Sequence, residues 1–130
     1  MINHFGIAVK DVEKSVKFYQ AALAAFGYKI HHAWEKGANF TDGISHDPYG
    51  DFEVHQGEPH PFHFAFQAKT NQEVDAWYAE AMANGGTDNG APGYRMDYRE
   101  NYYAAFIVDP DGYRIEAVCH NGQPHGIENL

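Results

Sequence analysis

The stretch Tyr102–His120, YYAAFIVDPDGYRIEAVCH, decides how this chain folds. Two apolar runs flank the Asp-Pro-Asp-Gly sequence at 109–112, where proline suits the first central position of a tight turn and glycine tolerates a positive φ. The pattern predicts two antiparallel strands, Tyr102–Val108 and Tyr113–His120, joined by that turn. Glu116 lies in the middle of the second run, and a buried carboxylate is costly unless it is paired or binds a cation.

Size and composition narrow the class of protein. The chain has 130 residues, of which 44% are hydrophobic and 21% charged, values that indicate one globular domain with a substantial core. Its formal net charge of -9 disfavours nucleic acid and anionic membranes as partners. The single cysteine excludes an intrachain disulfide. Because no segment resembles a signal peptide or a membrane span, we expect a soluble, cytoplasmic protein.

The order of predicted elements is the same in the two halves of the chain. In the first half we predict the strand Ile2–Val9, a helix from the N-cap Asp11 to Gly27, and the strands Tyr28–Trp34, Ala38–Thr41 and Asp51–Gln56. In the second half we predict the strand Phe62–Ala68, a helix that starts with a capping box at Thr70–Glu73 and ends at Gly85-Gly86, a polar loop from Thr87 to Asn101 with a short strand near Ala91–Met96, and the hairpin described above. The apolar faces of the two helices are Val12, Val16, Tyr19, Leu23 and Phe26 in the first, and Val74, Trp77, Tyr78, Ala81 and Met82 in the second.

The two halves also align residue by residue. FHFAFQA at 62–68 matches NHFGIAV at 3–9, so His63 takes the place of His4, and the same alignment places Glu116 on Glu53. Each copy is about 60 residues long, which indicates an internal duplication. We therefore predict an α+β fold of two βαβββ modules, at 1–57 and 62–121, in one domain of residues 1–130 that ends in a tail at 122–130.

Four residues recur at matching positions: His4, Glu53, His63 and Glu116. If the two sheets curve toward each other, all four meet in one cleft. Two imidazoles and two carboxylates suit a divalent metal such as Ni, Zn, Co, Mn or Fe, with two or three positions open for water or substrate. The alternative is that each is a packed or paired strand residue, and Glu53 has a further alternative as a base that binds no metal. The repeated register favours the metal.

Three segments carry a family resemblance: NHFGIAVKDVEKSVKFYQ at 3–20, FHFAF at 62–66 and YYAAFIVDPDGYRIEAV at 102–118. Together they resemble the glyoxalase/bleomycin resistance/dioxygenase group, the vicinal oxygen chelate superfamily. The resemblance implies paired βαβββ modules that form an open, cupped mixed sheet around a metal, with helices on the outside. It places His4, His63 and Glu116 on three metal positions, and Glu53 on the fourth position used by glyoxalase I. It also implies a homodimer, in some members with a site built from both subunits.

The expected activity is that of a metal-dependent lyase or isomerase, like lactoylglutathione lyase, acting on a small oxygenated or thiol-conjugated metabolite. The metal would act as a Lewis acid on an oxyanion or enediolate, while Glu116 or Glu53 moves a proton between carbons. One alternative is a metal-free protein that sequesters a drug or metabolite, as bleomycin-resistance proteins do. Others are an Fe(II) oxygenase and a thiol transferase; fosfomycin-resistance transferases usually carry Thr where this chain has Gly6.

Substrate contacts are predicted around the long polar loop, where five basic and aromatic residues gather: Arg95, Tyr98, Arg99, Tyr102 and Tyr103. Arginine and tyrosine near the mouth of a cup suit a carboxylate or a thiol-conjugate substrate. The alternative is a solvated loop whose tyrosines cover the core. The remaining histidines, His31, His32, His46, His55, His60 and His125, are interpreted as surface or loop residues.

Overall fold

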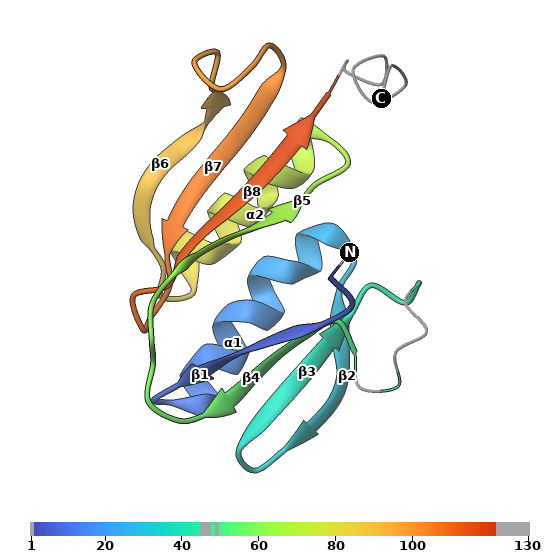
Figure 1. The fold of residues 1–130 in the computed structure, drawn as a ribbon, viewed down its shortest axis with the longest axis vertical. Coiled ribbons are helices and arrows are strands. Elements are labelled where there is room, and N and C mark those ends of the chain that lie inside the picture. Colours follow the sequence, from blue (N-terminus) through green and yellow to red (C-terminus); the bar gives the residue numbers. More distant parts are fainter. Residues whose placement is uncertain (1, 45–47, 49, 122–130) are drawn as a thin grey trace.

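The computed structural model describes residues 2–44, 48 and 50–121, and the predicted tail at 122–130 lies outside them. The first half contains β1 (Phe5–Val9), α1 (Val12–Leu23), a short 3-10 helix (Ala24–Phe26), β2 (Lys29–Trp34), β3 (Gly37–Thr41) and β4 (Phe52–Gln56). The second contains β5 (His63–Gln67), α2 (Asn71–Ala83), β6 (Thr87–Tyr94), β7 (Tyr102–Val108) and β8 (Arg114–His120). Both halves follow the order βαβββ, so the predicted α+β duplication is confirmed (Figure 1).

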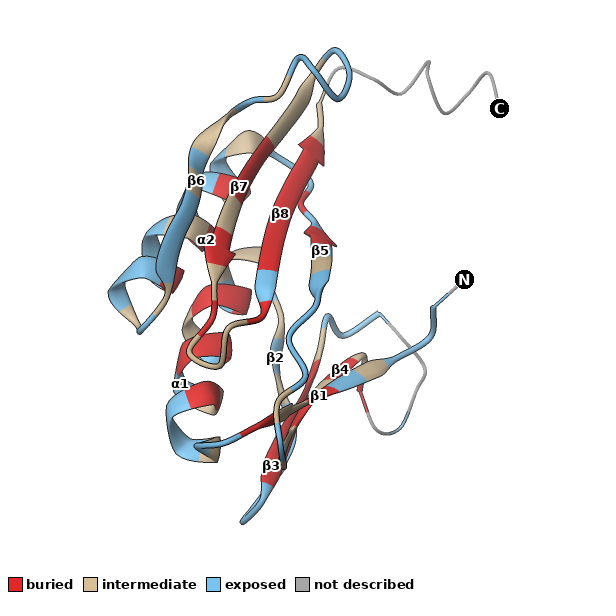
Figure 2. Cartoon of the chain, turned by 60° about the vertical axis from the view of Figure 1, so that its left-hand side comes forward, coloured by how far each residue is buried: buried red, intermediate tan, exposed pale blue. Residues whose placement is uncertain are grey.

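Each module forms its own four-stranded mixed sheet. The strand orders are β1-β4-β3-β2 and β5-β8-β7-β6, with the first pair of each sheet parallel and the others antiparallel. The registers repeat as well: Gly6 lies opposite Glu53 in one sheet, and Ala65 lies opposite Glu116 in the other. Burial is concentrated in inner strands such as β8, whereas the outer strand β6 is mostly exposed (Figure 2).

Local hydrogen bonds begin and end the helices near the predicted residues. The Asp11 carboxylate accepts a hydrogen bond from the Lys14 amide at 3.0 Å, and the 3-10 helix after α1 ends at Gly27 with φ +83°. The Thr70 hydroxyl accepts from the Glu73 amide at 3.1 Å, as a capping box requires. The Glu73 carboxylate accepts a hydrogen bond from the backbone amide of Lys69 and not from the backbone amide of Thr70, the usual donor in a capping box. No helix among the described residues is long and apolar enough to cross a bilayer.

The main departure from the predicted elements is β6, because most of the segment that was predicted as loop is strand. β6 pairs with β7 over eight residues, but the register shifts on both sides of Gly90. These irregularities interrupt the alternation of polar and apolar residues by which a strand is recognised in sequence. At the other end of the chain, β1 begins at Phe5 and is shorter than the predicted strand Ile2–Val9.

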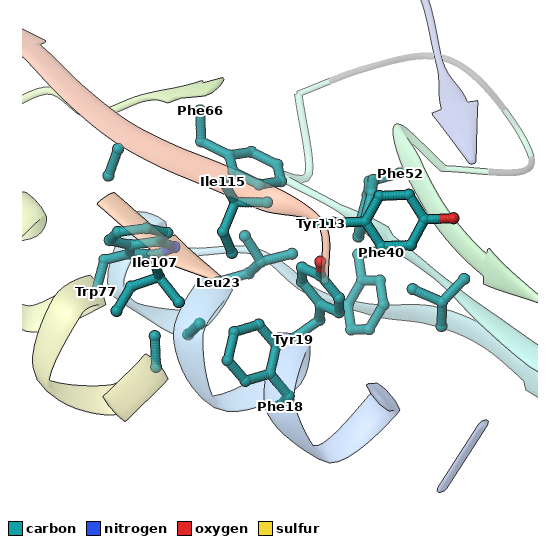
Figure 3. Packing of buried hydrophobic residues seen from close by; sticks show 14 of the residues in the cluster. Phe18, Tyr19, Leu23, Phe40, Phe52, Phe66, Trp77, Ile107, Tyr113 and Ile115 are labelled. Carbon is teal, nitrogen blue, oxygen red and sulfur yellow. The ribbon is translucent and has the colours of Figure 1, made fainter. Parts of the chain in front are cut away.

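The two modules share one hydrophobic core. Aromatic rings cross the boundary between them: Phe52 of the first module lies 5.6 Å from Phe66 of the second, measured between ring centroids. Tyr19 of α1 packs on Phe52 at 5.0 Å. Figure 3 shows these rings together with Trp77 and Ile107 of the second module. Burial of these large apolar side chains from both halves stabilises the contact between the modules.

The turn at 109–112 joins the second module to the first through buried hydrogen bonds. The Tyr19 hydroxyl donates to Asp109 Oδ2 at 2.5 Å, while Asp109 Oδ1 accepts the backbone amides of Asp111 and Tyr113. The Tyr113 hydroxyl donates to the carbonyl of Ala8 at 2.8 Å. Burial raises the pKa of the Asp109 carboxyl, and it also raises the pKa of Tyr19 well above its usual value.

Replacing Tyr19 by phenylalanine tests this contact. Tyr19→Phe should lower the free energy of unfolding at neutral pH by about 1–3 kcal/mol, because the buried Asp109 carboxylate loses a donor. The folded-state pKa of Asp109 is already raised, so its charge costs stability as pH rises through that pKa. The difference between variant and wild type should therefore shrink in acid, where the carboxyl is neutral. Urea denaturation across pH measures both effects.

Tyr78→Phe is the matched control, because the Tyr78 hydroxyl donates to the exposed carboxylate of Asp88 at 2.8 Å. Its effect should stay within about 0.5 kcal/mol. Equal losses in the two variants would show that Asp109 does not depend on Tyr19.

Candidate metal centre

Strand alternation divides β8 into two faces. Ile115, Ala117 and Cys119 belong to the hydrophobic core, while Glu116 points to the opposite, helix-free face of the sheet. On the neighbouring strand β7, Phe106 lies directly opposite Glu116. We call the helix-free side of each sheet its open face.

Glu116 is the best-defined carboxylate of the open faces. It is only 4% exposed, and two side chains contact its carboxylate, those of His63 and Tyr102. Its Oε1 lies 3.1 Å from Nε2 of His63, and its Oε2 accepts a hydrogen bond from the Tyr102 hydroxyl. The His63 side chain is 49% exposed. The structure therefore brings His63 and Glu116 together, with Tyr102 as a third member of the group.

The open face of the first module carries the other predicted pair. His4 and Glu53 line a pocket of about 240 Å³, together with Phe5, Gly6, Gly50 and Phe52. His4 Nδ1 lies 2.6 Å from Asn3 Oδ1, to which it donates, so the lone pair of this tautomer is on Nε2. Glu53 is 39% exposed, and its Oε2 lies 3.0 Å from Nδ1 of His55.

Gly6 makes room for Glu53. A Cβ atom at position 6 would lie 3.3 Å from the Glu53 Cβ, closer than most side chains pack, and 3.4 Å from its Oε2, in van der Waals contact. The equivalent position in the second module is Ala65, opposite Glu116. The absence of a side chain at Gly6 therefore lets the Glu53 carboxylate lie across β1 beside the pocket.

The two His–Glu pairs do not converge within one chain. Over residues 2–44, 48 and 50–121, no three His, Cys, Asp or Glu side chains lie close enough to hold one ion. The four residues therefore do not form one site within the described part of a single chain, and a site built from two subunits stays a prediction. The modules meet instead through rings of the shared core such as Phe52 and Phe66.

The predicted substrate residues divide between the two faces of the second sheet. The guanidinium of Arg95 lies 5.3 Å over the Phe106 ring, on the open face, but it donates to the carbonyls of Gly93 and Ala91. Tyr98 is exposed and packs edge-on against Tyr102. Arg99 is exposed in the turn that follows Arg95.

Tyr103 lies on the other face, because it follows Tyr102 directly in the strand. Its hydroxyl donates to Asp75 of α2 at 2.6 Å, and this bond is the main reason that the pKa of Tyr103 rises to about 12. The structure therefore does not place Tyr103 near Glu116.

Two side chains that contact the glutamates were not predicted to do so from the sequence: Tyr102, which bonds Glu116, and His55, which bonds Glu53. Tyr102 was grouped only with the loop, and His55 was assigned to the surface, yet each bonds a glutamate. A signal for His55 was present, because residues two apart in a strand share a face and His55 follows Glu53 by two. Alternation also separates Tyr102 from Tyr103, once the register of β7 against β8 is known.

Comparison with protein-family models and known proteins identifies the family of this chain. The model of the Glyoxalase/Bleomycin resistance protein/Dioxygenase superfamily matches residues 1–117. The uncharacterized protein YqjT of Bacillus subtilis is 26% identical over 91% of this chain and 98% of its own length. The glutathione transferase FosA of Serratia marcescens is 29% identical over 88% of this chain and 77% of its own length.

Solved structures give the same result. A glyoxalase/bleomycin resistance protein from Albidiferax ferrireducens T118 is 30% identical and superposes with a TM-score of 0.73, over 90% of this chain and 96% of that one. The fosfomycin resistance protein FosX of Listeria monocytogenes is 19% identical with a TM-score of 0.66, over 95% of both chains, and shares the fold.

The Tyr102 hydroxyl should keep its proton in alkaline solution. Burial and the bond to Glu116 raise the pKa of Tyr102 above its usual value near 10. The stability that this group contributes is full below that value and is lost as pH rises through the folded-state pKa. The difference in ultraviolet tyrosinate absorbance between wild type and Tyr102→Phe should therefore appear at higher pH than ionisation of free tyrosine amide. Ionisation at the same pH as the amide would contradict the buried contact with Glu116.

Proposed function

Because the chain belongs to the glyoxalase/bleomycin resistance/dioxygenase superfamily, we propose that it is a metal-dependent enzyme of the lyase or isomerase type. Its substrate would be a small oxygenated or thiol-conjugated molecule. The observation that carries this proposal is the buried carboxylate of Glu116, which lies on an open face with Nε2 of His63 3.1 Å from one of its oxygens.

The donor groups suit a divalent cation. Burying a carboxylate is costly in the absence of positive charge, and a cation beside Glu116 removes that cost. An imidazole nitrogen next to a carboxylate oxygen is a ligand pair that Ni, Zn, Co, Mn and Fe accept. The His4 tautomer, with Nδ1 bonded to Asn3, is the form in which a histidine binds metal through Nε2.

We place the complete centre between two copies of the chain. The His63–Glu116 pair of one copy would face the pocket that contains His4 and Glu53 of the other. Two observations support this arrangement. The two glutamates lie at equivalent register positions of the repeat, opposite Gly6 and Ala65. Within the described part of one chain, no three donor side chains lie close enough to hold one ion. A two-fold symmetric dimer would then contain two identical centres.

The two glutamates differ in ways that assign them different roles. Glu116 is buried, with Oε2 held by the Tyr102 hydroxyl and Oε1 beside His63, so we assign it the role of a metal ligand through Oε1. Glu53 is more exposed and lines the pocket, so it is the group that takes a proton from one substrate carbon and returns it to the next. Phe5 and Phe52 contribute aromatic rings to the lining of the same pocket. A bound divalent cation supplies Lewis-acid stabilisation of negative charge on substrate oxygens.

A second candidate activity is transfer of a thiol such as glutathione to an electrophile. The similarity to the glutathione transferase FosA, 29% over most of the chain, favours it. Two assays separate the candidates: isomerisation of a hemithioacetal, and addition of glutathione to an epoxide. Tight binding of a small molecule with neither metal nor turnover would instead indicate a sequestering protein.

Metal analysis tests the centre directly. Wild-type protein purified without a metal-affinity column should take up about one equivalent of a divalent metal per chain. His63→Ala and Glu116→Gln should weaken binding by more than about tenfold, since even groups that only support a ligand are worth that much. His60→Ala is the control, because His60 is an exposed histidine of the connector between modules. Uptake below about a tenth of an equivalent by wild type would disprove the proposal.

Mixing two defective variants tests whether the centre is shared between subunits. His4→Ala and His63→Ala homodimers should each lack an intact centre. Subunit exchange should restore about a quarter of the centres, because half of the dimers would be mixed and one of their two centres would be intact. Metal content after dialysis measures the recovery. No recovery, despite mass-spectrometric proof of exchange, would place the centre within one chain.

A further inference from the structure

The two oxygens of Glu116 have different partners. Oε2 accepts a hydrogen bond from the Tyr102 hydroxyl, while Oε1 lies beside Nε2 of His63 at 3.1 Å. The carboxylate is therefore held at one end by a donor from β7 and presents its other end to the imidazole.

Aromatic packing fixes Tyr102 in this position. Its ring packs edge-on against His120 of β8, with centroids 5.1 Å apart and planes at 82°, and against Tyr98 at 5.1 Å and 88°. Ala104 lies between Tyr102 and Phe106 on the same face of β7 and carries only a buried methyl group. Neighbours on two sides restrict the ring, so the hydroxyl stays at Glu116.

The first module lacks this support. Asn39 occupies, opposite Glu53, the position that Phe106 occupies opposite Glu116. Counting back four residues, as from Phe106 to Tyr102, gives Glu35, which precedes β3. Glu53 is bonded instead by His55 of its own strand. The tyrosine contact is thus a specific feature of the second module and not a property of the repeat.

We propose that Tyr102 is a positioning residue that makes Glu116 bind the cation through Oε1 alone. This inference rests on the proposed function. A carboxylate with one oxygen occupied by a donor binds through the other, and hydrogen-bonded partners of this kind orient metal ligands and tune affinity. One-oxygen binding leaves a further coordination position for an oxygen of the substrate. The tyrosine would therefore affect how many substrate atoms the centre accepts, without touching the substrate itself.

The test compares Tyr102→Phe with Tyr103→Phe. Both changes remove one hydroxyl that donates to a carboxylate, but Tyr103 bonds Asp75 on the helix side of the sheet. The phenylalanine ring retains the packing against Tyr98 and His120, and thermal unfolding checks that both variants fold. Titration with Co²⁺ measures affinity, and infrared difference spectra of protein with ¹³C-labelled glutamate carboxylates measure whether one or two oxygens bind.

Tyr102→Phe should bind Co²⁺ about 10–100-fold more weakly than wild type and should show a smaller splitting of the carboxylate stretching bands, the sign of two-oxygen binding. Tyr103→Phe should match wild type in both measurements. If Tyr102→Phe retains the affinity and the spectrum of wild type, the positioning role is wrong while the metal centre stands. If wild-type protein binds no Co²⁺, Ni²⁺ or Zn²⁺, the proposed function and this inference both fail.

Discussion

The buried contact between Tyr19 and Asp109 is the constraint on which the arrangement of the two modules depends. It places the tight turn of the second hairpin against the first helix, and Tyr113 extends the contact to the first strand through the Ala8 carbonyl. A buried hydrogen bond fixes the relative position of its two segments, because a shift of either one would leave a buried polar group without a partner at a cost in free energy. Together with the rings of Phe52 and Phe66, they join the modules through their core sides. The helix-free faces, with their His–Glu pairs, are left available to other molecules.

The duplicated register gives two similar pairs, but packing makes them chemically different. Glu116 is buried between an imidazole and a phenol, while Glu53 stays partly exposed beside a glycine. A carboxylate held from two sides is suited to binding a cation, and one that is partly exposed beside a pocket is suited to proton transfer with a substrate. The difference arises from a few neighbours, namely Tyr102, His55 and Gly6, and not from the backbone, which repeats closely.

Features that depend on residues close together in the sequence could be predicted, because local interactions determine them. The turn at 109–112, the caps at Asp11 and Thr70 and the βαβββ order follow from turn chemistry, capping and periodicity. Of β6, the part before Ala91 was missed, because irregular pairing around Gly90 interrupts its alternation. The spatial relation between the two His–Glu pairs was left open for another reason: it depends on how distant segments pack. Predicting the contact of Tyr102 with Glu116 requires the register of β7 against β8, which cannot be read from the sequence.

The repeat also affects how such a chain tolerates mutation. Each half supplies its own strand–helix–sheet unit, so a substitution on one open face leaves its counterpart on the other unchanged. The counterparts have already diverged, with Gly6 facing one glutamate and Ala65 the other. Redundancy of this kind permits specialisation: one copy can be selected for rigid anchoring while the other drifts toward new reactivity, and neither step requires a new scaffold.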